Sequence, residues 1–262
     1  MVMQKCPMCL ETKDVVSSHL IPAALYKFCD PPGGDPVAFN SQLVIETSRQ
    51  MQYPLLCSGC EDTLNKNGEL WMIPLFASLD GTFPFYDLLT SMPPALVDGD
   101  AKVYLAAYNP RIDVAKVIHF AMGIFWKAAV HSWIGGRTEP LIDLGDQTER
   151  IRKYLRGEGK LPDETVLMVG VLPKPVKHIA FTAPYQGSSR DKNNFLFYAL
   201  GIEFTLLVGN SINQEQRGAA FSANPGRPAL LVDFEPMLRD IVIDVTKDAR
   251  KASNVKKYLQ KF

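Results

Sequence analysis

Two pairs of closely spaced cysteines frame the beginning of the chain. Cys6 and Cys9 form the first pair, Cys57 and Cys60 form the second, and two residues separate the members of each pair. A C-x-x-C turn points both of its sulfurs the same way, so two such turns can supply four thiolates to one tetrahedral zinc ion. We therefore predict one structural zinc held by Cys6, Cys9, Cys57 and Cys60.

The same cysteines allow other interpretations. The alternatives are two disulfide bonds or four free thiols. Disulfides fit poorly because nothing in the chain indicates secretion, and C-x-x-C in an intracellular chain is more often a metal or redox site. A thioredoxin-like redox site fits poorly as well, because no strand–C-x-x-C–helix unit lies within a βαβ pattern. The fifth cysteine, Cys29, stands outside the pairs and is expected to be a plain thiol.

The segment between the cysteine pairs predicts a small zinc fold. A strand at Asp14–Ser18 should end at His19, and a short helix at Ala23–Phe28 should follow Pro22. A loop at residues 30–36 and a strand at residues 42–47 then lead to the second pair. A helix begins near Cys60, with acidic residues in its first turn that suit the helix dipole. Knuckle, hairpin, second knuckle and helix in this order describe a treble clef.

The rest of the chain predicts an α+β protein with a mostly antiparallel sheet. Apolar residues from Trp71 to Leu88 should form a packing strip between two parts of the molecule, the alternative being an aromatic platform for nucleic acid. Helices are expected at residues 113–133, 146–156 and 235–245. A strand is expected at 102–108. Further strands are expected at 165–172, 176–182, 195–208 with a bend at Gly201, and 229–233; because no helices are expected between these later strands, they should pair antiparallel. We place one domain at residues 1–94 and a second at 95–262.

The charge composition limits the possible partners. Lysine and arginine total 28, aspartate and glutamate total 28, and the net charge is zero. A strong non-specific nucleic-acid binder needs a basic surface, although a local basic face remains open. No apolar run approaches the roughly 20 residues that span a bilayer, and the N-terminus lacks the apolar core of a signal peptide. We expect a cytoplasmic protein without a membrane segment.

Several basic residues have two interpretations. Arg150, Arg152 and Lys153 on the predicted helix at 146–156 form either a weak nucleic-acid contact patch or a solvated polar face. The C-terminal lysines and arginines from Lys247 to Lys261 form either a solvated tail or a tether to a polyanion. His119 and His131 are expected to be packing or surface histidines rather than metal ligands.

The zinc frame resembles the HNH endonuclease superfamily, the ββα-metal nucleases, in its zinc-stapled variant. The resemblance rests on Cys6-x-x-Cys9, then Ser18-His19-Leu20-Ile21-Pro22, then Leu55-Leu56-Cys57-x-x-Cys60-Glu61, and it covers about the first seventy residues. It implies hydrolysis of phosphodiester bonds in nucleic acid, with His19 as the general base. We expect DNA to be preferred over RNA as the partner, and the choice between the two stays open. It also implies a second, catalytic metal ion, magnesium or manganese.

The chain departs from that pattern at several positions. Ser18 stands where the family usually has an acidic or histidine metal ligand, and Gln50 and Gln52 occupy the neighbourhood of its central asparagine. Glu61 replaces a histidine or asparagine with a hard oxygen donor that suits magnesium or manganese. Asn65 and Glu69 follow Glu61 at spacings of four on one helix face. The candidate catalytic residues are therefore His19, Glu61, Asn65 and Glu69.

Ser18 and the zero net charge favour an alternative. The segment would then be a catalytically inactive zinc module that binds nucleic acid or a protein partner. A third hypothesis, by analogy, is a nuclease subunit of a bacterial defence assembly in which another protein supplies the DNA affinity.

Overall fold

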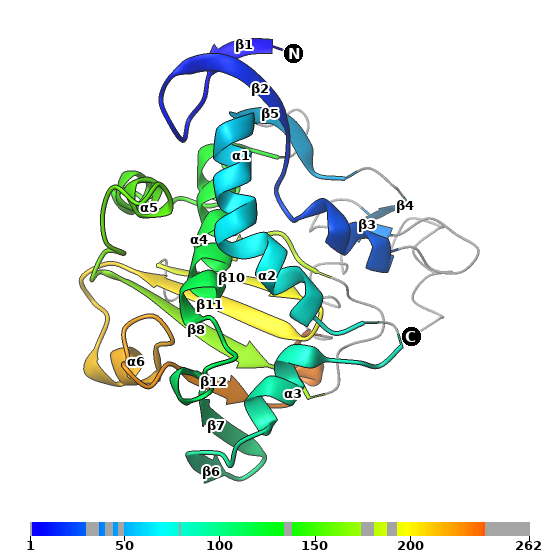
Figure 1. Ribbon diagram of the computed structural model, residues 1–262, viewed down its shortest axis with the longest axis vertical. Helices are drawn as coiled ribbons and strands as arrows, with labels where there is room; N and C mark the ends of the chain where they lie inside the picture. The colour runs from blue at the N-terminus through cyan, green and yellow to red at the C-terminus, as the bar shows by residue number, and fades with distance from the viewer. Residues whose placement is uncertain are drawn as a thin grey trace.

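The fold is α+β, with a small N-terminal sheet, a group of helices and a larger mixed sheet (Figure 1). The computed structural model describes residues 2–29, 37–39, 44–46, 50–78, 80–133, 138–173, 181–187 and 193–238. None of the helices in these ranges combines the length and the apolar character that crossing a bilayer requires.

The N-terminal sheet consists of β1 (Val2–Lys5), β2 (Thr12–His19) and β5 (Gln52–Cys57), in the order β1-β2-β5 with antiparallel pairing. Strand β2 ends at His19, as predicted. Between β2 and β5 lie the 3₁₀ helix η1 (Ala23–Cys29) and a hairpin of β3 (Val37–Phe39) and β4 (Val44–Glu46). The predicted loop at 30–36 and the rest of the predicted strand at 42–47 lie outside the described residues.

Strand β5 runs directly into a long helical segment. It begins as α1 (Ser58–Leu64), continues through the π-helical stretch η2 (Asn65–Glu69) and α2 (Leu70–Met72), and ends as η3 (Ile73–Leu75). Helix α3 (Pro84–Thr90) follows, and it buries Phe85, Leu88 and Leu89. The predicted packing strip thus contributes to the core through Phe76, Phe83, Phe85 and Leu88.

Two further helices connect this segment to the larger sheet. Helix α4 (Val114–Val130) packs against α1, η2 and α2, and α5 (Gln147–Leu155) packs against α4 (Figure 1). Both were predicted to within a few residues. Asp113 caps α4 by accepting a hydrogen bond from the Lys116 backbone N–H at 3.1 Å, which satisfies one of the free donors of the first turn.

The larger sheet has seven strands within the described residues, in the order β6-β7-β12-β8-β11-β10-β9. They are β6 (Leu96–Asp98), β7 (Ala101–Leu105), β8 (Thr165–Val171), β9 (Tyr185–Gln186), β10 (Asn194–Ala199), β11 (Ile202–Val208) and β12 (Pro228–Leu231). The 3₁₀ turn η4 (Ala106–Tyr108) follows β7, and α6 (Gln214–Ala219) follows β11. Among these strands only β12 and β8 pair in parallel.

The bend expected at Gly201 is a tight hairpin turn. Ala199 pairs with Ile202, and the two residues between them, Leu200 and Gly201, have positive φ angles of 37° and 92°. Two consecutive positive φ angles are the signature of the turns that suit the twist of a hairpin. One predicted strand is therefore two. Of the predicted strand at 176–182, Phe181 and Thr182 are described, and Phe181 bridges to Ala199.

The core lies between α4 and one face of the larger sheet. Phe120 and Phe125 of α4 contact Phe197 of β10, and Phe120 also contacts Phe204 of β11. The same apolar cluster extends without a break to Cys6, Leu56 and Leu64 in the N-terminal segment. It thus contains residues from both sides of residue 94, where the sequence suggested a domain boundary. That division stays a prediction.

The C-terminal predictions are described only at their beginning. Residues 235–238 are helical, which covers the first turn of the helix expected at 235–245. The remainder of that helix and the basic residues from Lys247 to Lys261 lie outside the described residues.

Candidate metal centre and the neighbouring histidine

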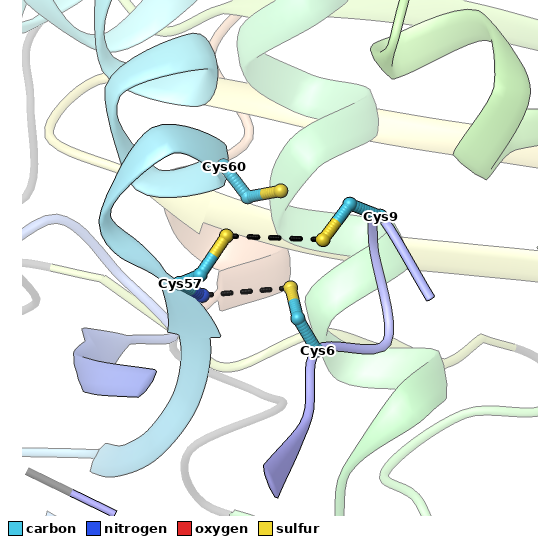
Figure 2. A group of neighbouring side chains, drawn as sticks. All are labelled: Cys6, Cys9, Cys57 and Cys60. Atoms are coloured by element: carbon cyan, nitrogen blue, oxygen red, sulfur yellow. Dashed lines mark hydrogen bonds between the residues drawn. The ribbon is translucent and has the colours of Figure 1, made fainter. Parts of the chain in front are cut away.

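The four predicted cysteines meet at one point. Cys6 and Cys9 come from the turn between β1 and β2, and Cys57 and Cys60 come from the junction of β5 and α1 (Figure 2). Their four sulfur atoms all lie within 4.8 Å of one another, and those of Cys9 and Cys57 are 3.8 Å apart. A tetrahedral zinc with Zn–S bonds of about 2.3 Å places its sulfurs about 3.8 Å apart. The donor set therefore fits a structural zinc.

The turn that presents Cys6 is built from local hydrogen bonds. The Leu10 N–H donates to the Cys6 carbonyl at 2.8 Å, and the Cys6 N–H donates to the Glu11 carbonyl at 2.9 Å. Leu10 has a φ of 65°, which lets the chain reverse at this point. The Cys57 N–H donates to the Cys6 sulfur at 3.4 Å and so joins the two turns. All four thiols are free rather than bonded as disulfides.

The pKa shifts of the cysteine thiols favour the binding of a cation. Hydrogen bonds from the Cys60 side chain and from the Cys57 backbone lower the pKa of the Cys6 thiol. The interaction with Cys6 raises the pKa of Cys60, and burial raises that of Cys9. Without a metal, the Cys6 thiol is therefore the easiest to deprotonate, and its thiolate makes deprotonation of Cys60 harder. A bound divalent cation removes this conflict, because it stabilises several thiolates at once.

Two arginines of the α5 region hold this centre from outside. Arg152 donates from Nη1 to the Met8 carbonyl, between the first two cysteines, at 2.6 Å. Its Nε and Nη2 donate to the Glu149 carboxylate at 2.7 and 2.8 Å, and its side chain is only 8% exposed. Arg156 donates to the Cys60 sulfur at 3.9 Å. Arg152 thus faces the interior of the protein.

The other two residues of the predicted basic patch are exposed. Arg150 pairs with Glu164 at 2.7 Å, and Lys153 lies 4.0 Å from Glu149. Of the three predicted nucleic-acid contacts, only these two present charge to solvent. The patch as a nucleic-acid contact stays a prediction.

His19 lies at the end of β2, half-buried, and is tied to the helices through its backbone. Lys127 of α4 donates to the His19 carbonyl at 2.6 Å, and its Nζ lies 3.3 Å from Oε1 of Glu69. The Lys127 side chain is 2% exposed and that of Glu69 is 17% exposed. Lys127 was not among the residues predicted from the sequence, although it is the single charged residue between Phe120 and Val130.

Ser18 helps to hold β2 and β5 together. It is fully buried, and its hydroxyl accepts a hydrogen bond from the Leu56 N–H at 3.0 Å. The register of β2 and β5 shifts between Val16 and Ser17, so the hydroxyl satisfies a backbone donor next to an irregular point of the ladder. Gln52 lies opposite His19 and accepts a hydrogen bond from the Ser17 hydroxyl at 3.3 Å.

The candidate residues on the helix are spread along its length. Glu61 follows Cys60 directly, and its Oε1 is buried without a hydrogen-bond partner in the described part of the chain. Asn65 begins the π-helical stretch and Glu69 ends it. Within the described residues, the four cysteines form the only group of three or more His, Cys, Asp or Glu close enough to share one metal ion. His19, Glu61 and Glu69 do not form such a group.

The two histidines of the α4 region have the packing positions that the sequence suggested. His119 is buried, its Nε2 lies 3.2 Å from the Leu155 carbonyl, and burial lowers its pKa. His131 follows the end of α4 and stacks on Tyr53 of β5.

Comparisons of the chain with protein families, with curated proteins and with solved structures found no match.

Proposed function

We propose that this protein is a metal-dependent nuclease of the HNH type that hydrolyses phosphodiester bonds in nucleic acid. The observation that carries the proposal is the order of elements around the thiolate centre. Strand β2 ends in His19, β5 pairs with it, and α1 starts at the second cysteine pair. This is the strand–strand–helix order that the resemblance implies. The four clustered cysteines join the β1–β2 turn to the start of the helix.

The chemistry assigned to these residues follows from their donor atoms. His19 is a candidate general base, because an imidazole nitrogen can accept the proton of an attacking water. The water oxygen then forms the new bond to phosphorus, and the leaving oxygen departs and is protonated. The unpartnered Oε1 of Glu61 is a hard donor of the kind that binds magnesium or manganese. Such an ion would offset charge on the scissile phosphate.

A nicking assay tests the proposal. Wild-type protein should relax supercoiled plasmid in the presence of magnesium, manganese or nickel, and His19→Ala should reduce the rate by at least about 100-fold, because a general base contributes that much. Equal zinc content in both proteins, measured by a colorimetric chelator, shows that the substitution leaves the thiolate centre intact. Failure of the wild-type protein to cleave either DNA or RNA with all three metals would falsify the proposal.

A second candidate function is a catalytically inactive zinc scaffold that binds nucleic acid or a protein. Two contacts favour it. The Ser18 hydroxyl accepts a hydrogen bond from the Leu56 N–H, and the Glu69 carboxylate pairs with the Lys127 ammonium, so both side chains already have protein partners. Salt-dependent DNA binding that His19→Ala leaves unchanged, without cleavage, would support this scaffold. No binding to DNA or RNA at low salt would instead favour a protein partner.

A further inference from the structure

A pair of stacked rings stands at the end of the β2–β5 strand pair. The rings of Tyr53 and His131 have centroids 4.1 Å apart and planes inclined by 27°. Tyr53 lies within β5 and is 44% exposed. Stacking on His131 therefore fixes the orientation of a ring that solvent still reaches.

The ring pair is held from behind by the end of α4. Trp133 is 9% exposed, lies edge-on to His131 at 5.3 Å, and donates from Nε1 to the Lys127 carbonyl at 2.7 Å. The same Lys127 donates from Nζ to the His19 carbonyl. One short stretch of chain thus positions both the ring pair and the end of β2.

The ring pair lies close to His19. Ser18 is paired with Tyr53 and His19 with Gln52. From the spacing of strands and of residues along them, the Cα atoms of Tyr53 and His19 are about 6 Å apart. Successive residues of a strand point to opposite faces, so the two side chains flank the end of the strand pair. Tyr53 shares its face with Ser18 and His19 lies on the opposite face, so a nucleic-acid strand would have to pass around this end of the strand pair to reach both.

The chemistry of the pair suits a flat, uncharged ring. Burial lowers the pKa of His131 and so disfavours the charged imidazolium that a phosphate would attract. The nearby ammonium of Lys127 is buried and already bonded to the His19 carbonyl and to Glu69. Aromatic rings presented in this way bind nucleobases by stacking, which tolerates any base sequence.

We propose that the Tyr53–His131 pair stacks an unpaired nucleobase, and that the substrate of the site is single-stranded or locally unpaired nucleic acid. The inference rests on the proposed nuclease function and specifies its substrate class. Bases inside a duplex are already stacked on their neighbours, and freeing one costs energy. The exposed Tyr53 ring should therefore favour a strand whose bases are free.

The test measures binding in a protein that does not cleave. Full-length, zinc-loaded His19→Ala protein is titrated, by fluorescence anisotropy, into a labelled single-stranded DNA of mixed sequence and into the matching duplex. We expect tighter binding to the single strand. Tyr53→Ala in this background should weaken that binding by about 5- to 150-fold, the range for loss of one stacked base. Tyr53→Phe, which keeps the ring, should leave binding nearly unchanged.

Tyr108→Ala is the matched control. Tyr108 is 68% exposed and precedes the start of α4, whereas His131 follows its end. The 17 residues of α4, a helix about 25 Å long, lie between the two positions in the chain. Binding unchanged by Tyr53→Ala, or weakened equally by Tyr108→Ala, would overturn the inference, as would a wild-type protein that binds no single strand at low salt.

Abasic probes keep the test independent of protein stability. Removing one base at a time from the DNA should reveal a position where its loss weakens binding to the His19→Ala protein. At that position Tyr53→Ala should cause no further loss, because the same contact is already gone. If binding depends on Tyr53 but wild-type protein never cleaves, the nuclease proposal fails and the stacking site stands. If wild-type protein cleaves but Tyr53→Ala leaves single-strand binding unchanged, the stacking site fails and the nuclease proposal stands.

Discussion

Lys127 carries a charge where burial makes an unpaired charge costly. Its side chain is 2% exposed, and the His19 carbonyl and the Glu69 carboxylate compensate it at 2.6 and 3.3 Å. Lys127→Met keeps the apolar length of the side chain but leaves Glu69 without its counter-ion. We expect the free energy of unfolding to fall by about 3 kcal/mol, as when one partner of a buried pair is removed. Urea denaturation followed by tryptophan fluorescence measures the change.

Lys116→Met is the control for Lys127→Met, because Lys116 lies on the same helix and pairs with Asp113 at 3.7 Å while 39% exposed. An exposed pair contributes at most about 1 kcal/mol, so this variant should be nearly as stable as wild type. Adding Glu69→Gln to Lys127→Met should recover part of the loss, since no charge then remains unpaired. Equal losses for the two lysine variants would contradict the role of burial.

At the residue scale, sequence identified what depends on local spacing and missed what depends on tertiary contact. The four cysteines could be grouped because two residues separate the members of each pair and thiolate chemistry is distinctive. Ser18 could be recognised only as a departure from a pattern, because its partner, the Leu56 amide, lies 38 residues away. Lys127 lies 108 residues from His19, and no local pattern connects them.

At the element scale, Gly68 determines how closely η2 approaches α4. A Cβ atom at this position would lie 2.8 Å from the backbone Cα and N of Phe120, which cannot move aside as a side chain could. Gly68→Ala should therefore separate the two helices and cost about 1–3 kcal/mol by overpacking. The thermal unfolding midpoint should fall.

Gly218→Ala on α6 is the matched control for Gly68→Ala. Nothing lies within 4 Å of the position its Cβ would occupy, so alanine should gain up to about 1 kcal/mol of helix propensity there. A Gly68→Ala protein as stable as wild type would mean that α1–η2 and α4 are not in direct backbone contact.

Helices and strands could be predicted where the spacing of apolar residues agrees with the residues that mark the start and end of an element. Helix α4 has an apolar repeat and an Asp113 cap, and its bounds follow from these. The strand at residues 195–208 was predicted as one because its apolar content continues through Leu200 and Gly201, whose positive φ angles make the turn. The π-helical stretch at Asn65–Glu69 and the parallel pairing of β12 with β8 have no local signature, because tertiary packing and topology set them.

At the scale of the whole molecule, the thiolate centre connects segments that are distant in sequence. It joins the β1–β2 turn to the start of α1, while Arg152 of α5 bonds to the Met8 carbonyl and Arg156 contacts Cys60. Beneath it, one apolar core continues from Leu56 and Leu64 to Phe120 and Phe197. A zinc ion bound here would therefore stabilise more than the N-terminal segment.

Metal removal tests whether the chain loses its structure as one unit. Zinc binding to a four-cysteine site can contribute on the order of 10 kcal/mol to folding. The indole of Trp126 is the natural reporter, because it is 1% exposed and lies on α4, outside the cysteine segment. After chelation at neutral pH we expect the thermal unfolding midpoint to fall. The fluorescence of Trp126 should change under the same conditions that make the N-terminal segment sensitive to protease. Re-addition of one equivalent of zinc should reverse both changes. If the protease removes only the first ninety or so residues and Trp126 stays buried, residues 1–94 and 95–262 are separate folding units and the shared core is not essential to either.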